Sequence, residues 1–237
     1  MLFFLIDLIR QDPGAALRVA PFIMTALGAG LLIALSVHEF GHAWVASRLG
    51  DQTAREMGRV TLNPLKHLDP AGTFVFLVVG FGWGRPVPVN SAMLRGGRRS
   101  VAYVSFAGPG SNFITAAAFG ILMRLYDVTP TTGIILSNPD LSMGAWLGTA
   151  LTYIVVYNLL LGVFNLIPLF PLDGSQVAFG IAPREIARQM LRFQPYAPTV
   201  LFGIIGIDLI LNVGILRSIL IPPVQIIGRA LLGQDLL

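Results

Sequence analysis

The residues with the clearest chemical potential are two histidines and a glutamate at positions 38–42. His38, Glu39 and His42 occur in the order His-Glu-Phe-Gly-His. On a helix, residues four apart lie one turn apart on the same face, so both imidazoles can bind one zinc ion. The adjacent carboxylate is then placed to act as a general base on water bound to that ion. The spacing predicts a hydrolytic zinc site but supplies only two of the three protein ligands such sites use.

The helix that must carry these residues is otherwise apolar. No ionisable side chain occurs from residue 19 to residue 37, and the histidine–glutamate pair follows at once. An ionisable cluster inside an apolar membrane helix is costly and indicates a functional site. Of the 237 residues, 54% are hydrophobic and only 12% are charged, against about 25% charged in soluble proteins. The composition therefore predicts a polytopic membrane protein with its site within the bilayer.

Four stretches are long enough for membrane-spanning helices, which need about 20 mainly apolar residues. We expect them at about 17–49, at 100–125, within 141–172 and, interrupted by Asp208, at 193–216. The predicted fold class is an all-α polytopic membrane protein, with interfacial segments at 1–16 and 217–237. We expect residues 1–237 to form a single domain with a catalytic core at about 20–180.

The first long loop does not fit a spanning helix. Residues 70–84 are apolar and rich in glycine, but the stretch is too short to cross a bilayer, so it predicts a re-entrant segment. The flanking pieces 58–62 and 86–90 are short, β-prone and bounded by proline and glycine. Together they predict a membrane-associated β-hairpin at the interface.

The distribution of basic residues predicts how the chain is oriented. The loop after the first span contains Arg48, Arg55, Arg59, Lys66, Arg85, Arg95, Arg98 and Arg99. A second basic group follows the third span, and it consists of Arg184, Arg188 and Arg192. Because basic loops are retained in the cytoplasm, we expect the site to lie toward the cytoplasmic face of the membrane. The net charge of +4 then reflects topology, so no nucleic-acid partner is expected.

A third metal ligand has to come from elsewhere in the chain. There is no cysteine, so the candidates are His67, Glu56, Glu185 and the aspartates. Asp173 stands out because Pro168 and Pro171 interrupt the helix before it. Irregular backbone at membrane depth is tolerated only where it is buried in protein or lines a water-filled cavity. Asp127 and Asp140 are predicted on the opposite side of the membrane.

At this point the chain resembles the site-2 protease family of intramembrane zinc metalloproteases, in its compact bacterial branch without a PDZ domain. The resemblance covers about 31–180. The motif His-Glu-x-x-His matches at 38–42, Gly-Pro-x-x-Asn at 108–112, and Asn-x-x-Pro-x-x-x-x-Asp-Gly at 165–174. The resemblance implies that Asp173 is the third ligand of one Zn2+ ion per chain. It also implies that Asn112 faces the active site and helps to hold the substrate strand.

The predicted activity is that of an intramembrane zinc metalloendopeptidase. Its expected substrates are transmembrane or membrane-anchored proteins, cut near the cytoplasmic face of a bacterial cytoplasmic membrane. In many relatives another protease cuts first, as in regulated intramembrane proteolysis. Two alternatives are a proteolytically inactive adaptor that binds membrane segments and a metal-binding transporter. The presence of Glu39 with all three ligands argues against the adaptor, and the single intramembrane cluster argues against the transporter.

Three polar residues near the motifs have more than one interpretation. Asn112 and Asn165 are candidates for substrate positioning, or for hydrogen bonding between helices or at a helix end. His67 lies in a turn-rich stretch and has three interpretations. It is a surface histidine at the interface, a group that supports the site or faces the substrate, or a fourth ligand that blocks the site at rest. The sequence does not indicate the oligomeric state.

Overall fold

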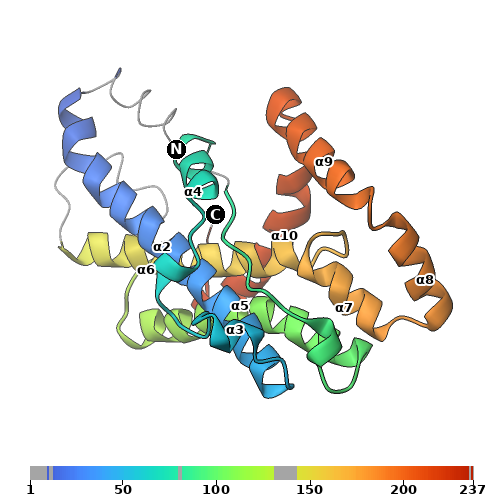
Figure 1. Cartoon of the computed structure of the whole chain (residues 1–237). Helices are drawn as coiled ribbons and strands as arrows, with labels where there is room; N and C mark the ends of the chain where they lie inside the picture. The colour runs from blue at the N-terminus through green and yellow to red at the C-terminus, as the bar shows by residue number, and fades with distance from the viewer. Residues whose placement is uncertain (1–9, 11–12, 80–81, 131–142, 235, 237) are drawn as a thin grey trace.

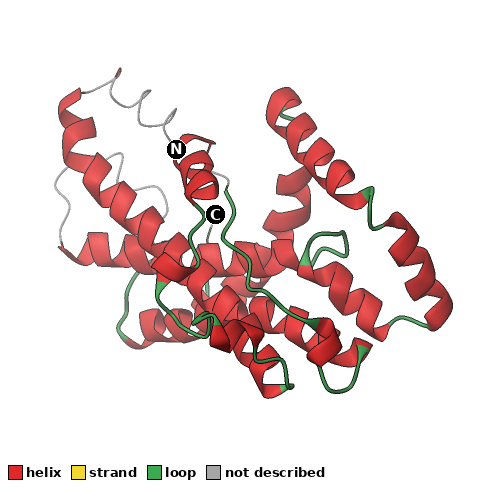
Figure 2. Cartoon of the chain, viewed as in Figure 1, coloured by secondary structure: helices red, strands yellow, loops and turns green. Residues whose placement is uncertain are grey.

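A computed structural model describes residues 10, 13–79, 82–130, 143–234 and 236. Every regular element in these ranges is helical, and Figure 2 shows no strand among them. The α-helices in chain order (Figure 1) are α2 (Pro13–Arg48), α3 (Thr53–Glu56), α4 (Pro70–Val79), α5 (Arg98–Leu125), α6 (Met143–Asn165), α7 (Asp173–Ile181), α8 (Arg184–Phe193), α9 (Ala197–Leu211) and α10 (Ile215–Leu232). Two short 3-10 helices, η1 (Pro64–Lys66) and η2 (Ser91–Met93), lie between α3 and α5.

Four helices in the described ranges are long and apolar enough to cross a membrane. They are the Thr25–Arg48 part of α2, together with α5, α6 and α10. Within the described ranges this confirms the predicted all-α class, with four helices that could span a membrane. The predicted interfacial segment at 1–16 lies mostly outside the described residues, and α2 already begins at Pro13.

The fourth of these helices is not the one that the sequence predicted. The predicted span at 193–216 is divided between α8, α9 and the start of α10, and α9 has only 15 residues. Asp208 accepts hydrogen bonds from the backbone N–H groups of Ile215 (2.6 Å) and Leu216 (3.2 Å). This carboxylate therefore caps the N-terminus of α10, where four backbone donors lack helical partners.

The predicted interfacial segment at 217–237 is also corrected, because residues 217–232 belong to α10. Pro222 and Pro223 lie inside this helix. Prolines are tolerated in membrane helices when neighbouring groups satisfy the freed backbone carbonyls. One buried cluster joins α10 to α5 and α6, and its members are Ala116, Met123, Val155, Val156, Leu159, Val224, Leu232 and Leu236.

α2 lies against both α5 and α6, and Figure 1 shows it crossing them near its middle. Glycine permits the close approach at both contacts. A Cβ atom at Gly30 would lie 2.8 Å from the carbonyl oxygen of Tyr153, and one at Gly41 would lie 2.5 Å from that of Ala107. Small residues at such contacts let helix backbones come close in a membrane. These two contacts set the position of the His-Glu-x-x-His turn against α5 and α6.

The predicted β-hairpin is wrong for the described part of the loop. α4 is a ten-residue helix in the predicted re-entrant stretch, and the backbone pairing nearby is an isolated antiparallel bridge between Leu68 and Gly84. Pro86 and Pro88 lack N–H groups, so one edge of the segment 86–90 has no donors at these two positions. The Arg59 guanidinium instead donates to the carbonyl oxygens of Arg85 (2.5 Å) and Pro86 (3.4 Å). The two segments predicted as strands therefore lie side by side, but the side chain of Arg59 joins them instead of a ladder of backbone hydrogen bonds.

Candidate metal centre

The three side chains predicted as metal ligands converge on one point. His38 and His42 lie one turn apart on α2, and Asp173 is the first residue of α7. The Oδ2 atom of Asp173 lies 3.1 Å from Nε2 of His38 and 3.2 Å from Nε2 of His42, and the two Nε2 atoms are 3.1 Å apart. Among the described residues, this is the one group of three histidine, cysteine or acidic side chains that could hold a metal ion.

Irregular backbone brings Asp173 to the histidines. α6 ends at Asn165, and residues 166–172 form turns and bends before α7 begins. Gly174 lets the first turn of α7 pack directly on this loop, because a Cβ atom there would lie 2.6 Å from the carbonyl oxygen of Ile167. The break in the helix that the prolines predicted is therefore present, and it delivers the carboxylate.

Hydrogen bonds fix which nitrogen of each histidine carries the proton. Nδ1 of His42 lies 2.7 Å from the carbonyl oxygen of Val104, which can only accept. Nδ1 of His38 lies 2.6 Å from Oδ1 of Asn112, whose Nδ2 donates to the carbonyl oxygen of Ala34 (2.8 Å). Both histidines therefore donate from Nδ1, and both present a lone pair at Nε2, the form that binds a metal.

The donor set and its surroundings fit a bound cation. The buried Oδ2 atom of Asp173 has no hydrogen bond of good geometry, although two Nε2 atoms lie beside it. Three lone-pair atoms thus face a common point. Gly108 of α5 closes another side, because a Cβ atom there would lie 2.6 Å from Cε1 of His42 and 2.8 Å from Cε1 of His38. Two imidazoles and a carboxylate suit Zn2+ and leave a fourth position open.

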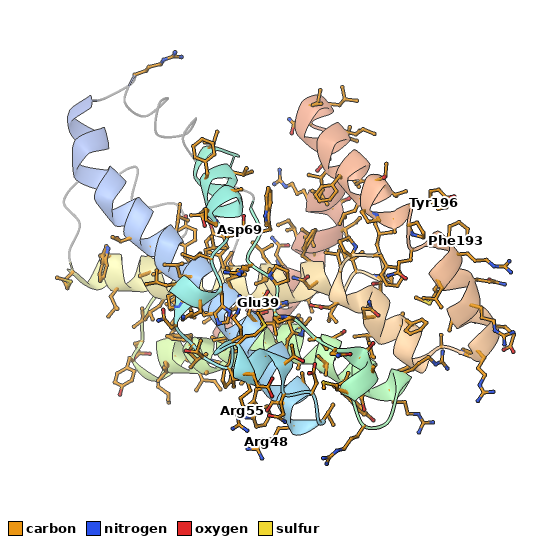
Figure 3. All side chains as sticks on the ribbon, in the orientation of Figure 1. Glu39, Arg48, Arg55, Asp69, Phe193 and Tyr196 are labelled. Atoms are coloured by element: carbon orange, nitrogen blue, oxygen red, sulfur yellow. The ribbon has the colours of Figure 1, made fainter. Side chains whose placement is uncertain are left out.

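Glu39 lies in the same cavity as this metal group. The cavity has a volume of about 440 Å³, and its lining comes from α2, the segment 86–91, α5 and residues 165–179. Figure 3 shows Glu39 where the helices meet at the centre of the molecule. The side chain is buried, and its Oε2 atom accepts a hydrogen bond from the backbone N–H of Val87 (2.9 Å). The carboxylate is therefore held beside the metal group by the segment after α4.

That segment is attached at both of its ends. The N–H of Arg85 donates to the carbonyl oxygen of His67 (2.7 Å), and the N–H of Asn90 donates to Oδ2 of Asp51 (2.6 Å). Burial raises the pKa of Asp51, but hydrogen bonds from Thr53 and Asn90 outweigh this and lower its pKa overall. Burial lowers the pKa of Arg59 beneath the segment, and the charge of Glu39 partly offsets this. The wall over the cavity is thus tied to the end of α2 and to the loop before α4.

The three polar residues with more than one interpretation occupy different places in the structure. Asn112 is fully buried, and its amide contacts His38 from the side opposite the metal group. Asn165 lines the cavity and donates to the carbonyl oxygen of Leu161 (3.0 Å). His67 is fully buried, so it is not a surface histidine, and it donates from Nε2 to the carbonyl oxygen of Thr61 (2.8 Å). The structure does not bring His67 into the metal group.

Sequence reasoning missed two contacts of the site. The approach of Gly108 to both histidine rings was not foreseen, although its place in the motif Gly-Pro-x-x-Asn was a signal. The hydrogen bond from Val87 to Glu39 had no signal in the sequence, because it depends on a backbone group 48 residues away. Both contacts are tertiary and become visible only when the helices are packed.

Comparison with known proteins identifies the family. Residues 26–205 match the model of peptidase family M50. The chain is 38% identical over 181 residues to "Putative zinc metalloprotease YwhC" of Bacillus subtilis, covering 73% of this chain and 77% of that protein. It is 34% identical over 153 residues to "Putative zinc metalloprotease Rip2" of Mycolicibacterium smegmatis, covering 62% of this chain and 53% of that protein. No solved structure matches the chain.

The family match includes all three motifs that the geometry brings together. It spans both histidines of α2, the glycine of α5 that packs on them, and the aspartate that begins α7. The carboxylate of Glu39 lies in the same cavity, among helices long enough to cross a membrane. The chain therefore belongs to peptidase family M50, the site-2 protease family, and is a metalloprotease.

Proposed function

We propose that this protein is an intramembrane zinc metalloendopeptidase. One Zn2+ ion per chain is held by His38, His42 and Asp173, and Glu39 is the catalytic acid and base. The observation that carries the proposal is the convergence of two Nε2 lone pairs and Oδ2 of Asp173, with the base in the same cavity. When bound, zinc lowers the pKa of a coordinated water and polarises the carbonyl of the scissile peptide.

The chain's own residues then have defined tasks. Val104 and Asn112 hold the two imidazoles in the metal-binding tautomer. Glu39 takes a proton from the attacking water and later delivers it to the leaving amine, as a general base and acid in turn. Asn165 lines the cavity at the end of α6, where its amide oxygen has room to accept from a substrate N–H group. The polar atoms of Asn112 are already engaged, so its role is to support His38.

The proposed substrates are transmembrane or membrane-anchored proteins. This is supported by the position of the cavity among candidate spans and beside the extended residues 85–90. An unwound substrate strand could add its backbone to this segment, as peptides add to exposed edges elsewhere. Pro86 and Pro88 have no N–H, so Val87 and Val89 are the donors between Arg85 and Asn90. Val87 now donates to Glu39, and pairing with a substrate would release the base.

The proposed location is a bacterial cytoplasmic membrane, with the site toward the cytoplasm and the lipid bilayer and a membrane protein as partners. The basic loops around Arg55 and Arg188 support this orientation. Figure 3 shows Arg48 and Arg55 together at one extremity of the molecule, near the C-terminal end of α2. His67 supports the loop before α4 through its bond to Thr61 and takes no part in metal binding. We propose one domain for the whole chain.

A single set of variants tests the activity. Membranes that contain the wild type or Glu39→Gln are compared for new protein N-termini, and zinc is measured in the purified proteins. We expect about one zinc per chain in both proteins, and new termini within membrane segments only with the wild type. Asp173→Ala should lose tightly bound zinc, because only two ligands remain.

Other outcomes would identify the rival classes. The same new termini with Glu39→Gln would exclude this glutamate as the base. Bound zinc without new termini in any sample would favour the adaptor. Zinc uptake into vesicles that contain the purified protein would favour the transporter. Equal and tight zinc binding in Asp173→Ala would remove this residue from the ligand set.

A further inference from the structure

Asn158 is a buried polar residue of α6 that the proposed mechanism does not use. It lies in the middle of a candidate span and is fully buried, where an unpaired amide would cost free energy. Its Nδ2 donates to the carbonyl oxygen of Ile154, one turn earlier (2.8 Å), and its Oδ1 accepts from Nδ2 of Asn112 (2.9 Å). Asn158 therefore links α6 to the residue on α5 that contacts His38.

The hydrogen bonds that link Ile154, Asn158, Asn112 and His38 have fixed directions, because the series ends at a backbone carbonyl. The carbonyl of Ile154 can only accept, so Asn158 must present its oxygen to Asn112. Asn112 then donates both protons of its amide, one to Asn158 and one to the carbonyl of Ala34. Its oxygen is left facing Nδ1 of His38, which must donate. Donation thus runs from the imidazole of His38 through Asn112 and Asn158 to the backbone carbonyl of Ile154.

The opposite orientation of Asn112 would disable the metal ligand. A half-turn of this amide would place its NH2 group against Nδ1 of His38, which would then have to accept. The imidazole would carry its proton on Nε2, where a metal must bind. Two acceptors, on Asn158 and Ala34, oppose this half-turn. Without the oxygen of Asn158, one acceptor is lost and a buried N–H of Asn112 has no partner.

We propose that Asn158 is a positioning residue that selects the metal-binding tautomer of His38 by orienting Asn112. The proposal rests on the proposed role of His38 as a ligand, and adds a residue with no contact to the metal group. Outer hydrogen-bond partners of metal-binding histidines typically change metal affinity or activity by about 10- to 100-fold when they are removed. Asn158 is one step further away, but it controls a choice between two discrete states.

The first test is the zinc affinity of the full-length protein, measured by competition with a chelator. Asn158→Leu keeps the approximate size of the side chain and removes the acceptor, and we expect zinc to bind about 10-fold more weakly or worse. Asn158→Asp, as the neutral acid that burial favours, can donate to Ile154 and keep an oxygen toward Asn112, so its zinc affinity should stay close to that of the wild type. Thr152→Val is the matched control, because it removes another buried polar group of α6, the hydroxyl of Thr152 that donates to Gly148, and it should leave zinc affinity unchanged.

A double-mutant cycle separates positioning from general loosening of the fold. If Asn158 acts through Asn112, then Asn112→Leu with Asn158→Leu should bind zinc no more weakly than Asn112→Leu alone. Additive losses, or wild-type affinity in Asn158→Leu, would overturn the proposal. If the wild type itself binds no zinc, the proposed function fails instead.

The tautomers can also be observed without any metal. The chain has three histidines, and the two tautomers of a neutral imidazole give different nitrogen signals. Nitrogen NMR of histidine-labelled, metal-free protein should show Nδ1–H for His38 and His42 and Nε2–H for His67, which donates to Thr61. In Asn158→Leu a second Nε2–H signal should appear. An unchanged spectrum in this variant would refute the selection of the tautomer, even if the variant is less stable.

Discussion

Replacing Gly108 by alanine tests the metal centre without changing a ligand. A Cβ atom at this position would lie 2.6 Å from Cε1 of His42 and 2.8 Å from Cε1 of His38, whereas ordinary contacts begin at 3.4 Å. Neither ring can turn aside freely, because each is held by a hydrogen bond from Nδ1, to Val104 or to Asn112. The added methyl group must therefore displace one ring or push α5 away from α2.

The expected loss follows from the size of this overlap. Forcing an extra carbon into a well-packed site costs about 1–3 kcal/mol, which corresponds to roughly a 5- to 150-fold weaker affinity if metal binding bears the whole cost. The helix itself should not suffer, since alanine is the better helix former by about 1 kcal/mol. We therefore expect a folded protein with a strongly weakened metal site.

The assay is chelator competition for zinc, with thermal unfolding measured in parallel. Gly110→Ala is the matched control on the same helix, because its Cβ atom would meet Phe106 at 3.4 Å, an ordinary contact. Gly110→Ala should bind zinc as the wild type does. Wild-type zinc affinity in Gly108→Ala would refute the placement of the two histidine rings against α5.

Two further predictions concern stability. Removing the metal with a chelator should lower the unfolding temperature, because a ligand at about 100 times its dissociation constant adds about 2.7 kcal/mol to the free energy of unfolding. The unfolding temperature of Asp173→Ala should not change when the chelator is added. Asp51 has a native pKa below its ordinary value of 3.8, so its ionised form stabilises the fold above that value and the contribution is lost as the pH falls further. The unfolding temperature of the wild type should therefore fall below about pH 4. Asp51→Asn should be less stable than the wild type at neutral pH, and its stability should depend less on acid. Equal acid sensitivity of both proteins would contradict this account.

Much of the metal group could be predicted because its information is local. The spacing of His38 and His42 places both rings on one helical face whatever the helix packs against. The prolines before Asp173 end a helix by their own covalent structure. Only the meeting of these two local signals required the fold, and the basic loops had already led us to predict that both lie toward the same side of the membrane.

The predictions from the sequence were wrong or incomplete where the partner of a residue is distant in sequence or is a backbone group. Asp208 looked like an interruption of a span, whereas its partners are N–H groups at the start of the next helix. The β-prone composition near Arg59 suggested a ladder, but prolines on the facing segment left carbonyls that a guanidinium satisfies. Asn158 was indistinguishable from any polar residue of a membrane helix until Asn112 lay beside it.

The two prolines of residues 85–90 have a consequence for the behaviour of many copies together. An extended segment beside an open cavity would normally be a template for edge-to-edge association and aggregation. Pro86 and Pro88 remove donors from this segment, and the donor of Val87 is directed inward to Glu39. Another copy of the chain would find few hydrogen-bond donors along it. The same residues that disfavour a sheet within the molecule thus protect the protein against self-association through this segment in a crowded membrane.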